Sequence, residues 1–286
     1  MSIYSIIVSY NPNIQNLNNL IKSITNHSIK VLIVDNSDTK NLFKIKNCET
    51  IHLGENKGIS FAQNKGIEIA KKRGAKFFIF FDQDSQISNS FFNNILSNYS
   101  QDDLHVRSPL ILDKESEKPM PSIKLNNLGF TSKFDTSKAL EPQQTDLIIS
   151  SGTVVNLKTL NIVGLMDENL FIDFVDTEWS FRCKKENIPI YIIPNAILNH
   201  SIGNKNFKFL NMTFFVHNSR RIYFQFRNCI ILFSKNHVPN LFVLKELISL
   251  FFHSFVVIFF KKNSFKSLKN IFLGLMDGFK FILNFK

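Results

Sequence analysis

The chain has 286 residues, 44% of them hydrophobic, which is enough to bury one sizeable core plus a helical appendage, and it contains no internal repeat or low-complexity linker. Three widely spaced cysteines without a Cys-x-x-Cys pair exclude a disulfide framework and are typical of thiols in a reducing compartment. The formal net charge of +11 lies entirely in residues 201–286, which hold 13 Lys and Arg against 2 Asp and Glu, but no groove-reading module is recognisable, so no nucleic-acid partner is expected.

The first part of the chain alternates apolar strands with amphipathic helices. The opening strand is stopped by Asn11-Pro12, because the residue before a proline is pushed out of the helical region. The order strand, helix, strand, helix, strand predicts a parallel sheet with right-handed crossovers. The predicted elements are a strand within 3–12 that Asn11-Pro12 stops, a helix from Ile14 to Ser23, a strand over 30–37 that ends in a carboxylate, a helix from Ile59 to Lys72 and a strand at 76–81.

Polar residues follow each predicted strand, and the carboxyl ends of parallel strands meet at the edge where open α/β sheets bind ligands. The third strand is rich in phenylalanine and ends in Asp82-Gln83-Asp84. A buried strand cannot hold two carboxylates inward without partners, so both must emerge at this edge. Two carboxylates one residue apart suit a Mg²⁺ or Mn²⁺ ion that also holds a diphosphate. Taken alone, Asp-x-Asp is more often a solvated turn that opens the next helix, so the flanking motifs decide.

Several short motifs flank this turn along the chain. They are Ser9-Tyr10-Asn11-Pro12, Val34-Asp35-Asn36-Ser37, Asn56-Lys57-Gly58, Asn64-Lys65-Gly66, Ser151-Gly152-Thr153 and Asp173-Phe174-Val175-Asp176-Thr177-Glu178-Trp179. In order and spacing they resemble the inverting glycosyltransferase family 2, which has the GT-A fold, over roughly residues 1–230. Within that family, Asp82-Gln83-Asp84, the Val-Asp-x-Glu-Trp segment and the residues 221–228 are similar to the rhamnosyltransferase branch of polysaccharide assembly.

The resemblance implies an α/β fold of the GT-A type, with a Rossmann-like, mostly parallel sheet flanked by helices and a C-terminal amphipathic helical appendage. We expect a catalytic domain at 1–204, with a nucleotide-sugar half at 1–112 and an acceptor half at 113–204, followed by a basic, Phe-rich helical region at 205–286. Asp35 is expected to accept a hydrogen bond from the pyrimidine N3–H of the donor, and Asp82 to lie near its ribose. The residues expected to bind the donor are Tyr10, Asn11, Pro12, Asp35, Asn36, Asn56, Gly58, Asn64, Asp82 and Gln83.

Single displacement at a sugar carbon needs one base that can reach the acceptor hydroxyl on the face opposite the leaving group. The candidates are Asp173, Asp176 and Glu178. If a helix begins near Val175, Asp176 lies at its N-terminus, where the macrodipole favours the ionised form, and the resemblance also points to Asp176. Glu178 is expected to pair with Arg182 at i,i+4, and the role of Asp173 stays open. The chain has valine at 175 where the family commonly has glutamate.

The resemblance implies a Mg²⁺ or Mn²⁺ cofactor. Asp84 is the first choice of ligand, and Asp82 and His200 are the other candidates. His200 follows an apolar, strand-like stretch, and a lone histidine is more often a core residue than a ligand. Some relatives in the family complete the metal site with a histidine at this place, which leaves the two interpretations of His200 even.

The tail carries 18 of the 31 phenylalanines as well as the excess positive charge, a combination expected of a segment that lies on an anionic membrane. The run Leu241 to Phe260 approaches the length of a membrane span, but the polar positions Lys245, Ser249 and His253 recur at i,i+4 and favour a helix in the membrane plane. Packing on the catalytic domain or a homo-oligomer interface is the alternative. An apolar face in the last helix is predicted from Phe265, Leu268, Phe272, Leu275, Phe279 and Ile282.

Residues 1–11 lack the basic region and the long apolar core of a secretion signal, so we expect a cytoplasmic enzyme, peripheral on the inner face of the bacterial cytoplasmic membrane. The predicted activity is transfer of L-rhamnose from dTDP-L-rhamnose to a hydroxyl of a lipid-linked oligosaccharide, in synthesis of an O-antigen or capsule type of polysaccharide. The alternatives are a family 2 transferase for UDP-galactofuranose or a UDP-hexose, and a catalytically silent scaffold that binds a sugar nucleotide. A scaffold has no need of a base, so Asp176 favours the enzyme.

Overall fold

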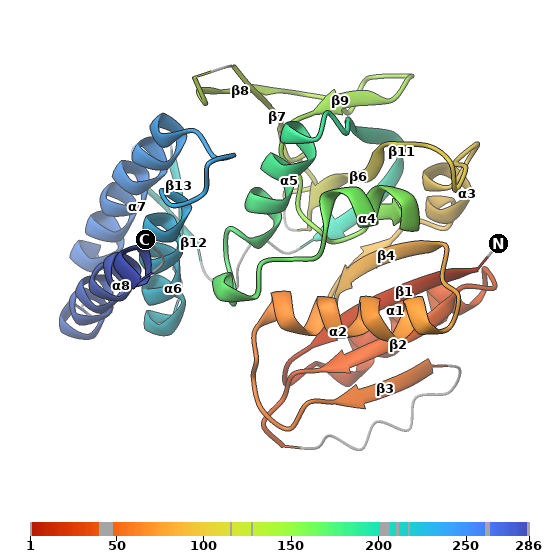
Figure 1. The fold of residues 1–286 in the computed structure, drawn as a ribbon, viewed down its shortest axis with the longest axis horizontal. Coiled ribbons are helices and arrows are strands. Elements are labelled where there is room, and N and C mark those ends of the chain that lie inside the picture. The colour runs from red at the N-terminus through yellow and green to blue at the C-terminus, as the bar shows by residue number, and fades with distance from the viewer. Residues whose placement is uncertain are drawn as a thin grey trace.

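The structure is a computed structural model, and it describes residues 2–39, 48–114, 116–126, 128–200, 206–209, 212–216, 218–260 and 264–284. A nine-stranded sheet forms the centre of the molecule (Figure 1), with the strand order β3-β2-β1-β4-β10-β6-β11-β5 and with β9 paired to β11. Its strands are β1 (Ile3–Ser9), β2 (Lys30–Asp35), β3 (Cys48–His52), β4 (Phe77–Asp82), β5 (Gln86–Ile87), β6 (Val106–Asp113), β9 (Gln143–Thr145), β10 (Val154–Asn156) and β11 (Ile190–His200).

The half of the sheet built from β3, β2, β1 and β4 is entirely parallel, as the βαβ order of the sequence predicts. Beyond β4 the sheet is mixed, because β10 runs antiparallel to both β4 and β6, while β11 returns parallel to β6. This arrangement brings the carboxyl ends of β1, β2, β4, β6 and β11 to one edge. The predicted helix at 59–72 agrees with the structure, whereas the strands predicted over 3–12 and 30–37 end earlier, at Ser9 and Asp35. The helix predicted at 14–23 extends to Thr25, and the strand predicted at 76–81 runs from Phe77 to Asp82.

Helices cover both faces of the sheet and form two hydrophobic layers. The alternation of β4 sends Phe78 and Phe80 into one layer and Phe77, Ile79 and Phe81 into the other. The first layer is covered by α2 (Ile59–Lys72), α4 (Leu157–Val163) and α5 (Val175–Lys185), and the second by α1 (Ile14–Thr25) and α3 (Phe91–Ile95).

The polar stretch from Asp113 to Asp146, expected to hold loops and short strands, contains a two-stranded hairpin of β7 (Ser122–Leu125) and β8 (Thr131–Phe134), followed by β9. A further hairpin, β12 (Asn206–Phe209) with β13 (Met212–Phe215), follows β11. A short 3-10 helix, η1 (Glu168–Leu170), precedes the loop that leads into α5. Of these elements, η1 leads to the edge of the sheet where the parallel strands end, whereas β9 pairs with the start of β11 at the opposite edge.

Three helices, α6 (Ser219–Leu232), α7 (Asn240–Phe260) and α8 (Ser264–Asn284), lie side by side at one end of the molecule (Figure 1). They are joined to the rest of the chain by shared packing: Cys229 of α6 and Phe242 of α7 lie in one cluster with Phe181 of α5. The predicted domain boundary at 204 stays a prediction, and α6 and α7 contribute to a core that spans it.

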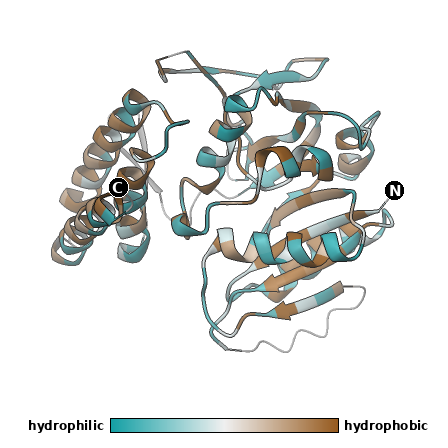
Figure 2. Ribbon diagram, in the orientation of Figure 1, coloured by the Kyte–Doolittle hydropathy of each residue, from teal (hydrophilic) through white to brown (hydrophobic). Residues whose placement is uncertain are grey.

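The outward faces of α7 and α8 are apolar (Figure 2). Within the described residues, α7 is the helix that is long and apolar enough to cross a membrane; its most apolar window has a mean hydropathy of 2.0, and 28% of that window is buried. By length and composition such a helix is weak support for a span. Of the polar positions predicted to form its outward stripe, Ser249 is exposed, whereas the neighbouring Ser254 is buried.

Candidate active site

The loops that follow β1 and β4 are fastened to each other by a glutamine. The side-chain amide of Gln83 accepts a hydrogen bond from the backbone N–H of Tyr10 (2.7 Å) and donates one to its carbonyl (3.2 Å). The Tyr10 ring is partly exposed beside this junction. The next residue, Asn11, adopts a left-handed backbone with φ of 44°, and its N–H donates to the hydroxyl of Ser37 (2.9 Å) in the loop after β2. Pro12 then leads into α1, so the three predicted loops do meet at one edge.

Asp35 lies at the end of β2 with its side chain fully buried. Its Oδ1 accepts hydrogen bonds from the hydroxyls of Ser9 (3.1 Å) and Ser37 (2.6 Å), and its Oδ2 lies 3.0 Å from Nδ1 of His52 at the end of β3. Oδ2 could accept one further hydrogen bond, but the side chain has no exposed surface through which a nucleotide would reach it. In the structure, Asp35 shapes the loops after β1 and β2, and its contact with a nucleotide stays a prediction.

The Asn56-Lys57-Gly58 motif is held against the loop after β2. The amide of Asn36 donates to Oδ1 of Asn56 (3.1 Å) and accepts from the N–H of Lys57 (2.8 Å). Gly58 has φ of 89°, and a Cβ built there would lie 2.6 Å from the carbonyl oxygen of Phe171, so the position requires glycine. The motif thus brings the start of α2 against the loop that precedes α5.

Asn64 was predicted to bind the donor, but its side chain lies inside the protein. Its amide donates to the carbonyl of Met166 (2.9 Å) and to the carboxylate of Glu168 (2.8 Å), and it accepts from the N–H of Met166 (2.9 Å). All of its hydrogen-bonding capacity but one lone pair is used, and the residue is buried. We correct the prediction for Asn64 accordingly: in the structure its hydrogen bonds join α2 to the segment before α5.

Asp82 and His200 meet at the same edge from β4 and β11, with 3.9 Å between Oδ2 and Nδ1. Among the described residues, the buried Nδ1 atom of His200 has no hydrogen-bond partner, and it faces the Asp82 carboxylate. Burial raises the pKa of Asp82, and the nearby charge of Asp84 raises it further, while His200 and Arg221 oppose the rise. At this edge Asp82 is therefore under the influence of the carboxylate of Asp84, the imidazole of His200 and the guanidinium of Arg221.

The chemistry of these side chains fits a divalent cation. Carboxylate oxygens suit Mg²⁺ and Mn²⁺, and an imidazole nitrogen extends the set to Mn²⁺. Within the part of the chain that the structure describes, no three His, Cys, Asp or Glu side chains converge on one point. Such a site would need oxygen atoms from a bound ligand or water, which is how Mg²⁺ is usually held beside substrate phosphates.

Asp176 occupies the second position of α5, on the first turn of the helix. Burial raises the pKa of this carboxyl group to about 7; hydrogen bonds from Ser150 oppose the rise, and the charges of Asp82 and Asp173 add to it. Because the charge of Asp82 acts on Asp176, the two carboxylates belong to the same site. A small cavity lies beside the partly buried carboxyl group, and it is lined by Phe80, Ile148, Ser150, Thr153, Met166, Asp176 and Trp179.

The two neighbouring acids are engaged elsewhere. Arg221 binds Asp173 through two nitrogens, with Nη2 to Oδ1 at 2.7 Å and Nε to Oδ2 at 3.0 Å. The predicted pair of Glu178 with Arg182 is confirmed at 2.9 Å, and His237 adds a second contact at 2.8 Å. Burial raises the pKa of Glu178, but these two partners outweigh it, and the net shift is downward. Within the described part of the chain, Asp176 is thus the acid of this segment that has no ion pair with a basic side chain.

Sequence analysis missed the residues that support Asp176. Ser150 hydrogen-bonds to it and is itself held by the amide of Gln63 (3.0 Å) on α2. Ser150 directly precedes Ser151-Gly152-Thr153, so the position of that motif was a usable signal. Arg221 belongs to a segment that was noted for its resemblance to rhamnosyltransferases without being given a role.

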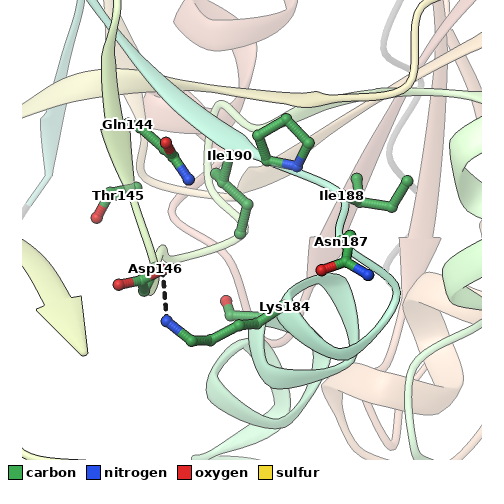
Figure 3. Close-up of a pocket in the computed structure, with 9 residues that line it drawn as sticks. Gln144, Thr145, Asp146, Lys184, Asn187, Ile188 and Ile190 are labelled. Atoms are coloured by element: carbon green, nitrogen blue, oxygen red, sulfur yellow. Dashed lines mark hydrogen bonds and ion pairs between the residues drawn. The ribbon is translucent and has the colours of Figure 1, made fainter. Parts of the chain in front are cut away.

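A polar pocket of about 360 Å³ lies at the opposite edge of the sheet (Figure 3). It is formed by β9, the end of α5 and the start of β11, and its lysine, Lys184, is paired with Asp146 at 3.0 Å. His200 and Ile190 are the two ends of the 11-residue strand β11, so the pocket is separated from the Asp82 edge by about 30 Å. It holds none of the predicted site residues.

Comparison with solved structures supports the architecture. The chain is similar to GalNAc-T7 in a crystal structure with UDP, GalNAc and Mn²⁺, with a TM-score of 0.58, 12% identity and coverage of 91% of this chain and 57% of that one. It is also similar to S. aureus TarS, with a TM-score of 0.53, 15% identity and coverage of 98% of this chain and 49% of that one. This chain therefore spans about half the length of these solved proteins, and the likeness confirms the predicted GT-A type of fold.

Sequence comparison reaches further. The dTDP-rhamnosyl transferase RfbF of Shigella flexneri is 36% identical over 283 residues, which cover 98% of this chain and 96% of that protein. The pattern of the family described as Glycosyl transferase family 2 matches residues 5–152, which contain the loops after β1, β2 and β4 and the Ser150 turn. Together with the convergence of those loops, these matches show that the chain belongs to glycosyltransferase family 2.

Proposed function

We propose that this glycosyltransferase moves L-rhamnose from dTDP-L-rhamnose to an acceptor hydroxyl with inversion at the sugar carbon, and that Asp176 is the catalytic base. The observation that carries the proposal is the contrast among the three acids of one segment. Asp173 and Glu178 are bound by basic side chains, whereas Asp176 is not and has a pKa raised to about 7. A base is most effective when its pKa lies near the working pH.

The choice of donor rests on the relative named as a dTDP-rhamnosyl transferase. At 36% identity over nearly the full length of both chains, the similarity spans the loops that would surround the nucleotide. It also spans the segment of α6 that contacts the loop before α5. Tyr10 offers a partly exposed ring beside these loops, where a pyrimidine base could stack. Asn11, Asn36, Asn56 and Gly58 shape the same rim.

In the proposed reaction, Asp176 accepts the proton of the acceptor hydroxyl while the hydroxyl oxygen forms a bond to C1 of the sugar. The bond between C1 and the diphosphate oxygen breaks, and the diphosphate leaves with its electron pair. Ser150 orients the carboxylate of Asp176 through its hydrogen bonds, and the apolar cavity behind it keeps water away. One carboxylate suffices, since the sugar undergoes a single displacement.

We further propose that Asp84, Asp82 and His200 hold Mg²⁺ or Mn²⁺ together with the donor diphosphate. Support comes from the unpartnered Nδ1 of His200, from the charge gathered at this edge, and from the Mn²⁺ in the crystal structure of GalNAc-T7. A divalent ion at this place would neutralise the charge of the leaving diphosphate. The three residues would hold it, together with oxygen atoms of the donor or of water, beyond the ends of β4 and β11.

For the acceptor, we propose a lipid-linked glycan, presented at the cytoplasmic face of the membrane to which α7 and α8 bind. The support is the pattern of α8, in which small residues face the protein and large apolar residues face outward. Its glycines face inward, where a Cβ at Gly274 would lie 2.5 Å from the carbonyl of Tyr223 and one at Gly278 would lie 2.7 Å from Ile230. Its large apolar residues face outward, as in helices whose surroundings are lipid. Lysines 266, 269 and 280 are exposed on the same helix.

Binding of a panel of nucleotide sugars tests the choice of donor. The purified chain would be mixed with dTDP-L-rhamnose, UDP-galactose, UDP-glucose or UDP-galactofuranose, each with and without Mn²⁺, and its unfolding temperature would be measured. A ligand that binds the folded chain but not the unfolded chain raises this temperature. We expect the largest rise with dTDP-L-rhamnose, and a dependence of that rise on the metal. A larger rise with a UDP-sugar would overturn the proposed donor.

A further inference from the structure

The loop that leads into α5 has an uncommon backbone conformation. Phe171, Asp173 and Phe174 all have positive φ angles, of 57°, 62° and 62°, and none of them is glycine. Such conformations are sparsely populated for residues with a Cβ, and they persist only where the surroundings impose them. Phe174 is also the N-cap residue of α5, and its side chain makes no capping bond. The direction of the first turn of α5 therefore depends on what holds this loop.

Every carbonyl from Asn169 to Asp173 accepts a hydrogen bond from outside the loop. Arg227 donates to the carbonyl of Asn169 (2.7 Å). The amide nitrogen of Asn228 donates to the carbonyls of Leu170, Ile172 (2.7 Å) and Asp173 (3.2 Å). The remaining carbonyl, that of Phe171, accepts from the N–H of Ile59 (2.7 Å) at the start of α2. Four of the five carbonyls are thus held by two adjacent residues of α6.

Arg221 holds the same loop from another position on α6. Its guanidinium grips the Asp173 carboxylate through two nitrogens. Arg221 and Asn228 are seven residues apart, which places them on one face of the helix, two turns apart. Asn228 is completely buried, and its Oδ1 accepts from Arg227 (2.9 Å), so its amide orientation is fixed. We call Arg221, Arg227 and Asn228 the α6 clamp.

We propose that Arg221 and Asn228 of the α6 clamp are positioning residues for catalysis: they impose the conformation of the loop before α5 and thereby aim the carboxylate of Asp176 at the acceptor hydroxyl. This inference rests on the proposed role of Asp176 as the base. The clamp also links the base to the donor loops, since Phe171 is bonded to Ile59 and lies against Gly58. A small displacement of a reacting group lowers the rate steeply, so the geometry of this loop should control turnover more than binding.

The first variant is Asn228→Asp, which keeps the shape of the side chain but presents an oxygen where the amide nitrogen faced three carbonyls. Its matched control is Asn156→Asp. Asn156 is equally buried, and its amide nitrogen donates to the carbonyls of Ser100 (3.1 Å) and Asp103 (2.7 Å), but it pairs with Phe77 at the far end of β4. Each variant loses hydrogen bonds from a buried amide nitrogen to backbone carbonyls, but Asn156 lies far from Asp176.

The second variant is Arg221→Lys, which keeps the charge and loses the two-nitrogen grip on Asp173. Arg221 is 41% exposed, so this variant is expected to fold even if Asn228→Asp does not. Its control is Arg73→Lys, since Arg73 makes a comparable two-nitrogen pair with Glu49 on the surface of the parallel half of the sheet. If Asn228→Asp does not fold, the comparison of Arg221→Lys with Arg73→Lys decides the inference.

For each variant, kcat, the KM for dTDP-L-rhamnose and the unfolding temperature would be measured. We expect kcat to fall about 10-fold or more in Asn228→Asp and by a smaller factor in Arg221→Lys, with KM changed less than about 3-fold, because a base that is misaligned still allows donor binding. The controls should lose stability without losing kcat. The inference is overturned if the clamp variants keep the kcat of the wild type, or if clamp and control variants lose kcat equally. Full activity of Asp176→Asn would instead overturn the proposed base itself.

Discussion

Three acids lie within six residues of one another at the start of α5, and the partners of each carboxylate set its role. Asp173 is bound by Arg221, and Glu178 by Arg182 and His237, so both carboxylates already have basic partners. Asp176 has hydrogen bonds from Ser150 and an apolar cavity beside it. Groups whose pKa is shifted by their surroundings in this way are characteristic of catalytic sites.

The first prediction concerns the pH dependence of turnover. A base must be deprotonated to act, so kcat/KM should rise with pH through the pKa of Asp176, which burial places at about 7. Below that value, kcat/KM should fall about tenfold for each pH unit. The check is a profile from pH 5 to 9 with saturating metal. A profile that is flat between pH 5.5 and 8 would contradict the assignment.

The second prediction concerns stability. Because the pKa of Asp176 is higher in the folded chain than in the unfolded one, the folded state binds the proton more tightly. The resulting stability is present at about pH 4 and is lost as the pH rises through about 7. Asp176→Asn removes the buried charge, so it should unfold at a higher temperature than the wild type at pH 8, and the difference should vanish near pH 4. Thermal unfolding across this range is the measurement, and a variant that is less stable at pH 8 would count against the burial of this charge.

The third prediction concerns the metal. Asp84→Ala removes a strand-end carboxylate and creates no core cavity, so the fold should be kept while transfer is abolished. Transfer activity and Mn²⁺-dependent donor binding would be compared with those of Asp102→Ala, which changes an exposed acid in a loop on the opposite edge. The metal assignment would be wrong if Asp84→Ala turned over at the rate of the wild type, or if the wild type turned over in excess EDTA.

At the scale of elements, the C-terminal helices combine two kinds of surface. The inward face of α8 carries Ser267, Ile271, Gly274 and Gly278, which allow close packing on α6. The outward face carries large apolar residues that no described part of the chain covers: Phe265, Leu268, Phe272, Met276, Phe279 and Leu283. Exposed apolar surface of this extent on a protein marks an interaction site.

The fourth prediction tests this outward face. The triple variant Phe265→Gln, Phe272→Gln and Phe279→Gln leaves the inward face of α8 intact, whereas deletion of the helices would also remove core residues such as Phe242. We expect it to lose binding to vesicles that contain anionic lipid and to keep the turnover of a short, water-soluble acceptor. High salt should weaken binding of the wild type only in part, because the apolar contribution is not screened. The control is Leu140→Gln, at an exposed site of the acceptor half.

The opposite result for this face is equally clear. If the wild type does not bind vesicles, elutes as an oligomer whose size is independent of salt, and becomes a monomer in the triple variant, the outward face of α8 is an interface between copies of the chain. The membrane would then have no part in the function of the tail.

For the molecule as a whole, the sequence predicts best what is local. The continuous apolar run of β4 and the alternation of strands and helices in the first 85 residues predicted the parallel half of the sheet and the meeting of the loops after β1, β2 and β4 at one edge. The edge strand β3 was missed, because Cys48–His52 has little apolar pattern of its own and is stabilised by pairing with β2. The position of β10 between β4 and β6 was also unpredictable, since three residues carry no signal for strand order.

The parts of the site that sequence analysis missed depend on contacts between distant segments. Asn228 binds carbonyls 55 to 58 residues before it, and Gln63 binds Ser150 from 87 residues away. Asn64 belongs to a motif of the family and was taken for a donor contact, although its partners are Met166 and Glu168. A motif shows that a side chain is needed at a position, but the fold decides whether it faces a substrate or another loop.

The measurement that tests the account most directly is the turnover of Asp176→Asn. Asparagine keeps the size of the side chain and its hydrogen bonds but cannot accept the proton of the acceptor hydroxyl. With dTDP-L-rhamnose as donor, the account predicts that the rate of transfer falls by about 10² to 10⁴ while the affinity for the donor is nearly unchanged. A rate within a few-fold of the wild type would show that Asp176 is not the base, and the assignment of roles among the three acids would have to be made again.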